Sequence, residues 1–205
     1  MGVVTVFPDD RAQAHTLEAF AAAILIVAGL TFALQATAVT PLSASTSNQH
    51  LENQQRAVAN DLLETSAASG DLEAALLRWD PVNETFTDGR SPSYFTGGGP
   101  PNAFGEGLNA TFGERRIAFN VHVRHGPDGA AETTLVDMGS PSDNAVTATR
   151  TVVLTDDANL TAPGYEDTTL RALSNGSEPG EFYAADVGGG AVYDRLEVRI
   201  VVWQL

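Results

Sequence analysis

The sequence of 205 residues contains no cysteine and no lysine. Without cysteine, disulfide bonds, thiolate metal sites and a cysteine nucleophile are excluded. Without lysine, a Walker-type phosphate-binding loop is excluded, because that motif needs a lysine after its last glycine. The two runs of three glycines, at 97–99 and 188–190, are therefore interpreted as surface loops or linkers.

Positive charge is also scarce, since 11 arginines face 26 Asp and Glu residues and the formal charge is −15. Nucleic-acid binding is not expected, because phosphate contacts need clustered basic residues. Self-repulsion of an acidic surface falls when salt screens it, so the composition suits a high-salt environment. An ordinary acidic extracellular protein is the alternative interpretation.

Signatures of catalysis or metal binding are missing as well. The sequence has no G-x-S-x-G nucleophile elbow. His122 and His125 are three apart on a predicted strand, which places them on opposite faces, so a shared metal is not expected. The acidic stretches 137–143 and 156–157 lack EF-hand spacing, and weak calcium binding there is an alternative to a solvated surface. We predict a protein that is not an enzyme and needs no cofactor.

The longest uncharged stretch lies between Glu18 and Glu52. Within residues 19–34 only Thr31 is polar, and 19–39 would form a helix of roughly 31 Å, about the thickness of one hydrocarbon core. The stretch has no charged face, so we predict a transmembrane helix over residues 19–40. Pro41 is expected to break or kink it.

Small residues recur four apart in this segment, at Gly29, Ala33 and Thr37. This spacing predicts one helix face on which another helix packs closely. Chance recurrence in an alanine-rich segment is the alternative. The flanking charge gives no orientation, because Arg11 is the only basic residue before the segment and Arg56 is the first after it.

Four Asn-x-Ser/Thr triplets follow the apolar segment, in stretches predicted to be loops. They begin at Asn83, Asn109, Asn159 and Asn175. Such triplets are candidate N-glycosylation sites and are typical of an exported face. They favour a C-terminal domain on the outer side of the membrane.

The next region predicts helices. Leu51, Val58, Leu62 and Leu63 recur at helical spacing, with Gln55 on another face, which predicts an amphipathic helix over 51–66. Gly70 should end this helix, and Asp71 should cap a second one that reaches Trp79. Residues 41–80 are thus expected to form a helical stalk. Residues 80–113, rich in proline and glycine, are expected to be a loop.

Alternating apolar residues then predict strands near 117–123 and 191–203. A turn at 126–129 predicts a returning strand at 133–138, and the β-branched residues of 147–155 predict a fourth strand. The expected fold class is α+β, with a long N-terminal helix packed on an antiparallel sheet. The helix around 51–63 is the natural cover for the apolar face of the sheet.

The residues at the start of the apolar run, 13–20 (QAHTLEAF), resemble the start of a type IV pilin. Together with 34–50 (LQATAVTPLSASTSNQH), they are similar to pilin-like proteins of halophilic archaea, over about the first 65 residues. The resemblance implies cleavage after Gln13 by a prepilin peptidase, so that Ala14 becomes the first mature residue. It also implies that Glu18 pairs with the free amine of a neighbouring subunit. A carboxylate at the bilayer edge needs such a partner, and a plain interfacial residue is the alternative.

This interpretation divides the chain into a leader or cytoplasmic segment (1–18), a transmembrane helix (19–40), a stalk (41–80) and an extracellular β-rich domain (81–205). The expected function is a minor or accessory structural subunit of a type IV pilus-like surface filament. Its expected partners are the membrane and other pilin-like subunits, through the N-terminal helix. Two alternatives stay open: an anchored extracellular binding domain that does not polymerise, and a secreted protein whose signal peptide is cut after Ala38.

Overall fold

The computed structural model describes residues 9–87, 89–187 and 190–205, with the side chains of 9–14, 36–48 and 114 outside the description. The chain divides into two units, residues 1–49 and 50–205, and each is described by itself. Helix α1 (Asp9–Ser69) contributes residues to both. Pro41 does not break the helix, because α1 continues through this residue, and the alternative of a kink stays a prediction. A proline removes one donor from a helix, and the remaining hydrogen bonds can carry the helix past it.

The helical part of the second unit begins with the last residues of α1, which ends at Ser69 as predicted from Gly70. Gly70 has a φ of 84°, a left-handed conformation that glycine adopts at no steric cost. Helix α2 (Asp71–Leu76) follows directly and is shorter than predicted. Asp71 is not its cap: Gly70 occupies the N-cap position without a side-chain hydrogen bond, and Asp71 lies in the first turn.

The predicted loop at 80–113 contains a helix, α3 (Ala103–Thr111), so this prediction is wrong. The Asn102 side chain accepts a hydrogen bond from the Gly105 N–H at 3.0 Å and caps the helix start. Phe104 and Leu108 are fully buried on one helix face. The short helix α4 (Leu170–Ser174) was also not predicted and is capped in the same way by Thr169. Single-turn helices η1 (Gly113–Arg115) and η2 (Pro127–Gly129) complete the set, η2 at the predicted turn.

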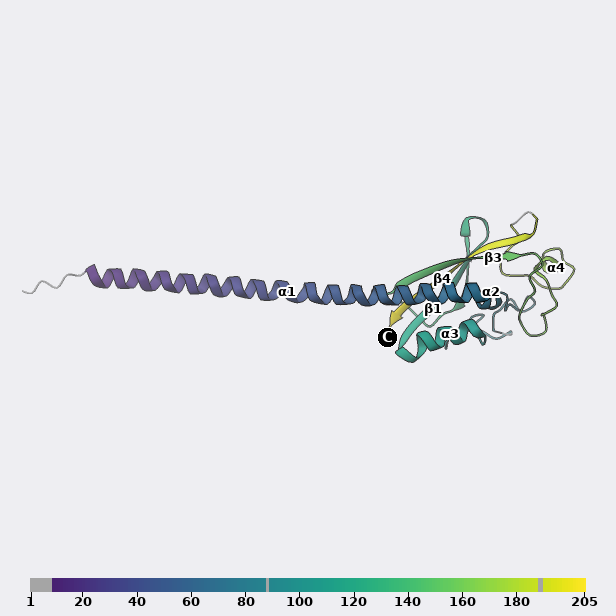
Figure 1. Cartoon of the computed structure of the whole chain (residues 1–205), viewed down its shortest axis with the longest axis horizontal. Helices are drawn as coiled ribbons and strands as arrows, with labels where there is room; N and C mark the ends of the chain where they lie inside the picture. The colour runs from purple at the N-terminus through teal and green to yellow at the C-terminus, as the bar shows by residue number, and fades with distance from the viewer. Residues whose placement is uncertain (1–8, 88, 188–189) are drawn as a thin grey trace, which may run out of the picture. The chain divides into compact units, whose positions relative to one another are not determined.

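The four predicted strands are confirmed as β1 (Ile117–His125), β2 (Ala131–Val136), β3 (Val146–Thr155) and β4 (Val192–Gln204). They form one antiparallel sheet in the order β2-β1-β4-β3. Figure 1 shows this sheet with α2 and α3 in the same unit. The expected α+β class is therefore confirmed, with the last strand along the chain lying inside the sheet.

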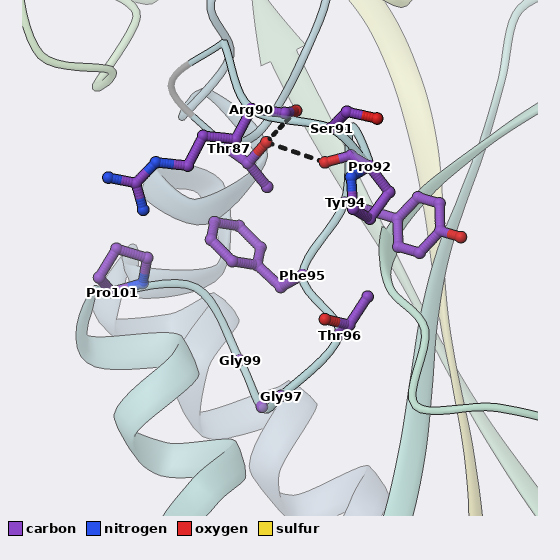
Figure 2. A pocket seen from close by; sticks show the side chains of 11 residues that line it. Thr87, Arg90, Ser91, Pro92, Tyr94, Phe95, Thr96, Gly97, Gly99 and Pro101 are labelled. Carbon is purple, nitrogen blue, oxygen red and sulfur yellow. Dashed lines mark hydrogen bonds between the residues drawn. The ribbon is translucent and has the colours of Figure 1, made fainter.

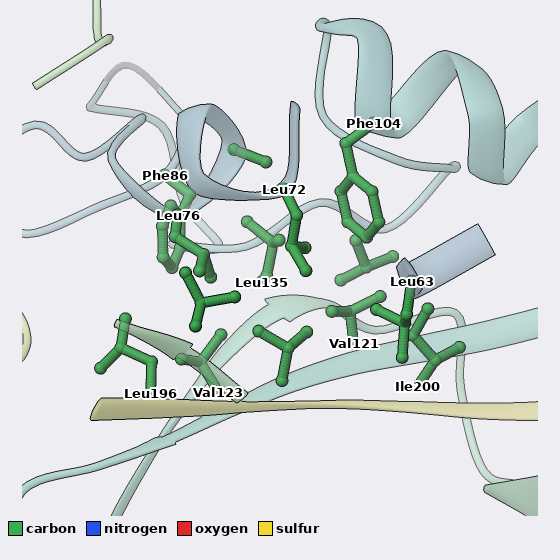
Figure 3. Packing of buried hydrophobic residues seen from close by; sticks show 14 of the residues in the cluster. Leu63, Leu72, Leu76, Phe86, Phe104, Val121, Val123, Leu135, Leu196 and Ile200 are labelled. Atoms are coloured by element: carbon green, nitrogen blue, oxygen red, sulfur yellow. The ribbon is translucent and has the colours of Figure 1, made fainter. Parts of the chain in front are cut away.

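One face of the sheet forms the core of the second unit. Val121 and Val123 from β1 and Ile200 from β4 belong to the same buried cluster as Leu63 and Phe104 from the helices (Figure 3). Helix residues and strand residues thus share a single apolar layer, as expected for a helix that covers a sheet. No described residue before Ala59 belongs to this cluster.

The buried face of α1 differs from the prediction at two positions. Gln55 is only 8% exposed and aligns with Ala59 and Leu63, whereas Leu51 is 39% exposed. Residues 55, 59 and 63 are spaced by four, so they lie on one face of a helix. Leu51 lies one turn before Gln55 and lines a small hollow with Ile117 and Gln204.

The other face of the sheet carries polar and charged pairs. Arg199 of β4 lies 3.2 Å from Glu132 of β2, and Arg124 lies 3.6 Å from Glu197. Such exposed ion pairs add at most about 1 kcal/mol each. Asn120 on the same face is buried, and its amide bonds both Met138 N and Gly139 O, which holds the loop after β2 against the sheet.

Candidate functional site

The exposed apolar segment of α1, residues 15–35, is the first candidate site. It has 21 residues, and none of its described side chains is buried within the chain. Its large apolar side chains are 53–75% exposed. Thr31 donates its hydroxyl to the Val27 carbonyl at 2.8 Å, so this polar group is satisfied inside the helix. By length and composition, this helix can cross a membrane.

Glu18 stands near the start of the segment, as predicted. Its Oε2 lies 3.8 Å from Nδ1 of His15, one helical turn earlier, and both side chains are more than 80% exposed. The predicted cleavage residues Gln13 and Ala14 lie outside the described side chains. His15 is thus a described neighbour of the carboxylate, and the sequence reasoning did not identify this pair.

The predicted packing stripe is described at two of its three positions. A Cβ added at Gly29 would meet no atom within 4 Å, so the helix surface is open there. Ala33 is exposed on the same segment, and Thr37 lies outside the described side chains. This part of α1 thus permits the close approach of another helix.

The four candidate glycosylation asparagines are all exposed in the second unit, at Asn83, Asn109, Asn159 and Asn175. The prediction that all four lie in loops is wrong for one of them, Asn109. Asn109 lies within α3, and Asn159 forms an isolated bridge with Thr169. Asn83 follows a tight turn, and Asn175 is the C-cap residue of α4.

The turn at Asn83 is built on a buried carboxylate. Asp80 accepts hydrogen bonds from the N–H groups of Val82 and Asn83, at 3.0 and 2.9 Å, and from Nδ2 of Asn83 at 2.8 Å. Burial alone would raise the pKa of Asp80, but these hydrogen bonds and one from Tyr165 outweigh it and lower the pKa.

A surface cavity of about 460 Å³ is the second candidate site (Figure 2). Its loop is fixed at both ends: Phe95 bonds the backbone of Leu135 and Asp137 beside β2, and the Gly99 N–H donates to Asn109 Oδ1 at 3.0 Å. Thr87 Oγ1 lies 2.7 Å from the Arg90 carbonyl oxygen. The lining residues are Thr87, Arg90, Ser91, Pro92, Tyr94, Phe95, Thr96, Gly97, Gly98, Gly99 and Pro101.

The described residues of this lining carry groups that can contact a ligand. They offer aromatic rings, hydroxyls and one guanidinium. A cavity of this size suits a small ligand. The sequence reasoning took this region for a loop and did not identify the cavity.

A smaller hollow of about 230 Å³ lies where α1 meets the ends of β1 and β4. Leu51, Val58 and Phe112 line it, together with Gln55. Gln55 Nε2 is buried without a hydrogen-bond partner among the described residues. A buried amide without a hydrogen-bond partner lowers the stability of the fold.

The histidines do not converge. His122 lies 3.3 Å from Thr134 Oγ1 and His125 lies 2.9 Å from Thr133 Oγ1. Burial lowers the pKa of both rings, and nearby carboxylates oppose the shift only in part. Over the described residues, no three His, Asp or Glu side chains are grouped closely enough to hold a metal ion. Asp156 and Asp157, considered for calcium, lie within 3.4 Å of Arg171.

Together these features define an α+β protein with one helix long and apolar enough to cross a membrane. The chain belongs to a protein family described as a family of unknown function (DUF7288), whose model matches residues 11–202. The match covers both the apolar helix and the sheet unit. No curated protein and no solved structure matches the chain.

Proposed function

We propose that this protein is a membrane-anchored, pilin-like structural subunit of an archaeal surface filament, in a minor or accessory role. The observation that carries the proposal is the fully exposed apolar segment at 15–35, which begins at a carboxylate and precedes a separate α+β unit with its own core. A helix that is apolar all round needs a membrane or a bundle of like helices around it. A filament subunit would lie in the membrane before assembly and in the helix bundle of the filament after assembly.

The proposed topology is a single pass with residues 50–205 outside the cell. Four Asn-x-Ser/Thr triplets, whose asparagines are all exposed in this unit, support that side, and so does the strongly acidic composition. Processing by a prepilin peptidase after Gln13 would leave Ala14 with a free amine, and Glu18 of a neighbouring subunit would pair with it. An unpaired carboxylate inside a bilayer or a helix bundle has a high free energy. The pairing would therefore set the register between neighbouring subunits.

The mature N-terminus, measured by mass spectrometry on protein from its native membrane, tests the proposal. A chain that starts at Ala14 supports it. A chain that starts at Met1 or Gly2 contradicts it and leaves a static anchor. A chain that starts at Val39 contradicts it in favour of secretion.

Amino-acid substitution tests the role of Glu18. We expect Glu18→Ala to abolish incorporation into filaments while the protein stays in the membrane, and the exposed control Glu64→Ala to have no effect. Because His15 lies beside Glu18, His15→Gln is the decisive comparison. Incorporation that survives in His15→Gln supports pairing with a neighbouring amine, whereas equal loss in both variants would assign the role to the pair within one chain.

The cavity of about 460 Å³ favours one second candidate function, an anchored extracellular binding domain that does not polymerise. In that case the leader would stay uncut and Glu18→Ala would leave the protein's function intact. Substitution in the half-buried wall formed by Tyr94 and Phe95, for example Phe95→Ala, would then abolish ligand binding without changing anchoring.

A further inference from the structure

We propose that Asn175 is the residue that carries an N-linked glycan, and that the fold hides the other three Asn-x-Ser/Thr triplets. The inference rests on the proposed function only in that residues 50–205 must lie outside the membrane. The donor would be a sugar linked through phosphate to a lipid. Nδ2 of the asparagine forms a bond to C1 of the sugar, the bond from C1 to the phosphate oxygen breaks, and the amide gives up one proton as the lipid phosphate leaves.

Two groups of each triplet must be reached by a transferase that acts on the folded chain. These are the asparagine Nδ2, which is glycosylated, and the hydroxyl two residues later, which completes the recognised motif. The backbone between them must also lie in a loop that can enter an enzyme. The four triplets differ sharply in these respects.

The triplet at Asn83 is blocked at both groups. Nδ2 donates to Oδ2 of the buried Asp80 at 2.8 Å. The hydroxyl residue, Thr85, is only 3% exposed, and its Oγ1 lies 2.9 Å from Thr87 Oγ1. Glycosylation here would require the turn to open.

The triplet at Asn109 lies in α3, where the backbone is helical through Thr111. Oδ1 of Asn109 accepts the Gly99 N–H at 3.0 Å, and Thr111 is half-buried. Access would require the end of the helix to unwind and the cavity loop to lose its attachment.

The triplet at Asn159 is blocked at the hydroxyl. Thr161 Oγ1 donates to the Ala74 carbonyl at 2.5 Å, and its N–H donates to the Leu77 carbonyl at 2.9 Å. These two hydrogen bonds hold the backbone at Thr161 against α2, and Thr161 is half-buried. Asn159 is exposed, but the hydroxyl of Thr161 is already hydrogen-bonded and a transferase cannot reach it.

The triplet at Asn175 differs from the other three in that its hydroxyl residue is exposed. Asn175, Gly176 and Ser177 are all exposed and lie just after the five-residue helix α4. Ser177 donates both its N–H and its hydroxyl to Asn175 Oδ1, at 2.9 and 2.5 Å. These bonds use the amide oxygen and not Nδ2, and they bring the two recognised groups together on the surface. Gly176, with a φ of 71°, permits the tight turn.

The arginine positions make the test direct, because trypsin places each triplet on its own peptide. These peptides are 79–90, 91–115, 151–171 and 172–195. In protein extracted from its native membrane we expect glycan mass on 172–195. Asn175→Gln and Ser177→Ala should remove it, Ser177→Thr should keep it, and the neighbouring exposed control Ser174→Ala should leave it unchanged.

An unmodified 172–195 peptide, a glycan on one of the other three peptides in its place, or a glycan that survives Ser177→Ala would overturn the inference. Protease treatment of intact cells separates this failure from that of the proposed function. An unmodified Asn175 in a chain whose residues 50–205 are cut from outside refutes the glycan site and leaves the filament proposal standing. Full protection from the protease refutes both.

Discussion

At the scale of single residues, the buried Asp80 stabilises a turn of the second unit. Its buried carboxylate accepts the N–H groups of two consecutive residues and an amide side chain. We expect Asp80→Ala to lower the free energy of unfolding by about 2 kcal/mol, because three N–H donors lose their charged acceptor. Urea unfolding of the full chain in detergent measures this. The exposed Asp61→Ala is the control, and equal effects in the two variants would contradict this role.

The buried histidines make stability depend on pH. The pKa of His125 is lowered from 6.5 by burial, with partial opposition from Asp194. The unfolded chain therefore takes up a proton at a higher pH than the folded chain does, so stability is complete above about pH 6.5 and is lost as pH falls through the folded pKa. His122 shifts in the same direction.

We expect the free energy of unfolding to fall between about pH 7 and pH 5, and His125→Gln to reduce this slope. The measurement is a series of urea midpoints across that range. His50→Gln, at an exposed position, should leave the slope unchanged. A slope in His125→Gln identical to that of the natural chain would show that other groups cause the pH dependence.

Among the elements, α3 depends on one close approach. A Cβ at Gly105 would overlap the Pro100 carbonyl oxygen, whereas a Cβ at Gly107 would meet only the tip of Leu62 at 3.2 Å. We expect Gly105→Ala to destabilise the protein by about 2 kcal/mol or more. Gly107→Ala should stay within about 1 kcal/mol of the natural chain, because improved helix propensity offsets the shift of Leu62. Thermal unfolding compares the two, and a milder effect at Gly105 than at Gly107 would refute the contact.

The elements also show which features the sequence predicts. Strands β1 and β4 follow from local alternation of apolar residues, such as that of Phe119, Val121 and Val123, because a half-buried strand imposes a period of two. Helix α3 was missed because the glycines and prolines around it obscured its cap at Asn102. Burial of Gln55 could not be predicted, since it depends on how far the sheet extends along α1.

For the candidate sites, the sequence likewise predicts the local motif but not the contacts made by distant residues. Asn-x-Ser/Thr triplets and the apolar run are visible in the sequence as short local patterns. Their accessibility is not, because the hydroxyl of Thr161 is bound by Ala74, 87 residues earlier in the chain. The cavity around Phe95 likewise depends on backbone bonds to a strand 40 residues later.

At the scale of the whole molecule, the core and the apolar segment do not overlap. Every described core residue lies at Ala59 or later, within the unit His50–Leu205. We expect a chain that starts at His50 to fold without detergent and to unfold cooperatively, as followed by circular dichroism. The full chain should need detergent, since its exposed apolar helix would associate in water. Aggregation or loss of structure in the short chain would mean that residues before His50 contribute to its fold.

The position of β4 has a consequence for the order of events during synthesis. It is the last of the four strands along the chain, yet it pairs with β1 on one side and β3 on the other. The sheet therefore cannot close until the ribosome has passed residue 204, about 170 residues after the apolar segment has emerged. Membrane targeting of the apolar segment would therefore come before the sheet is complete.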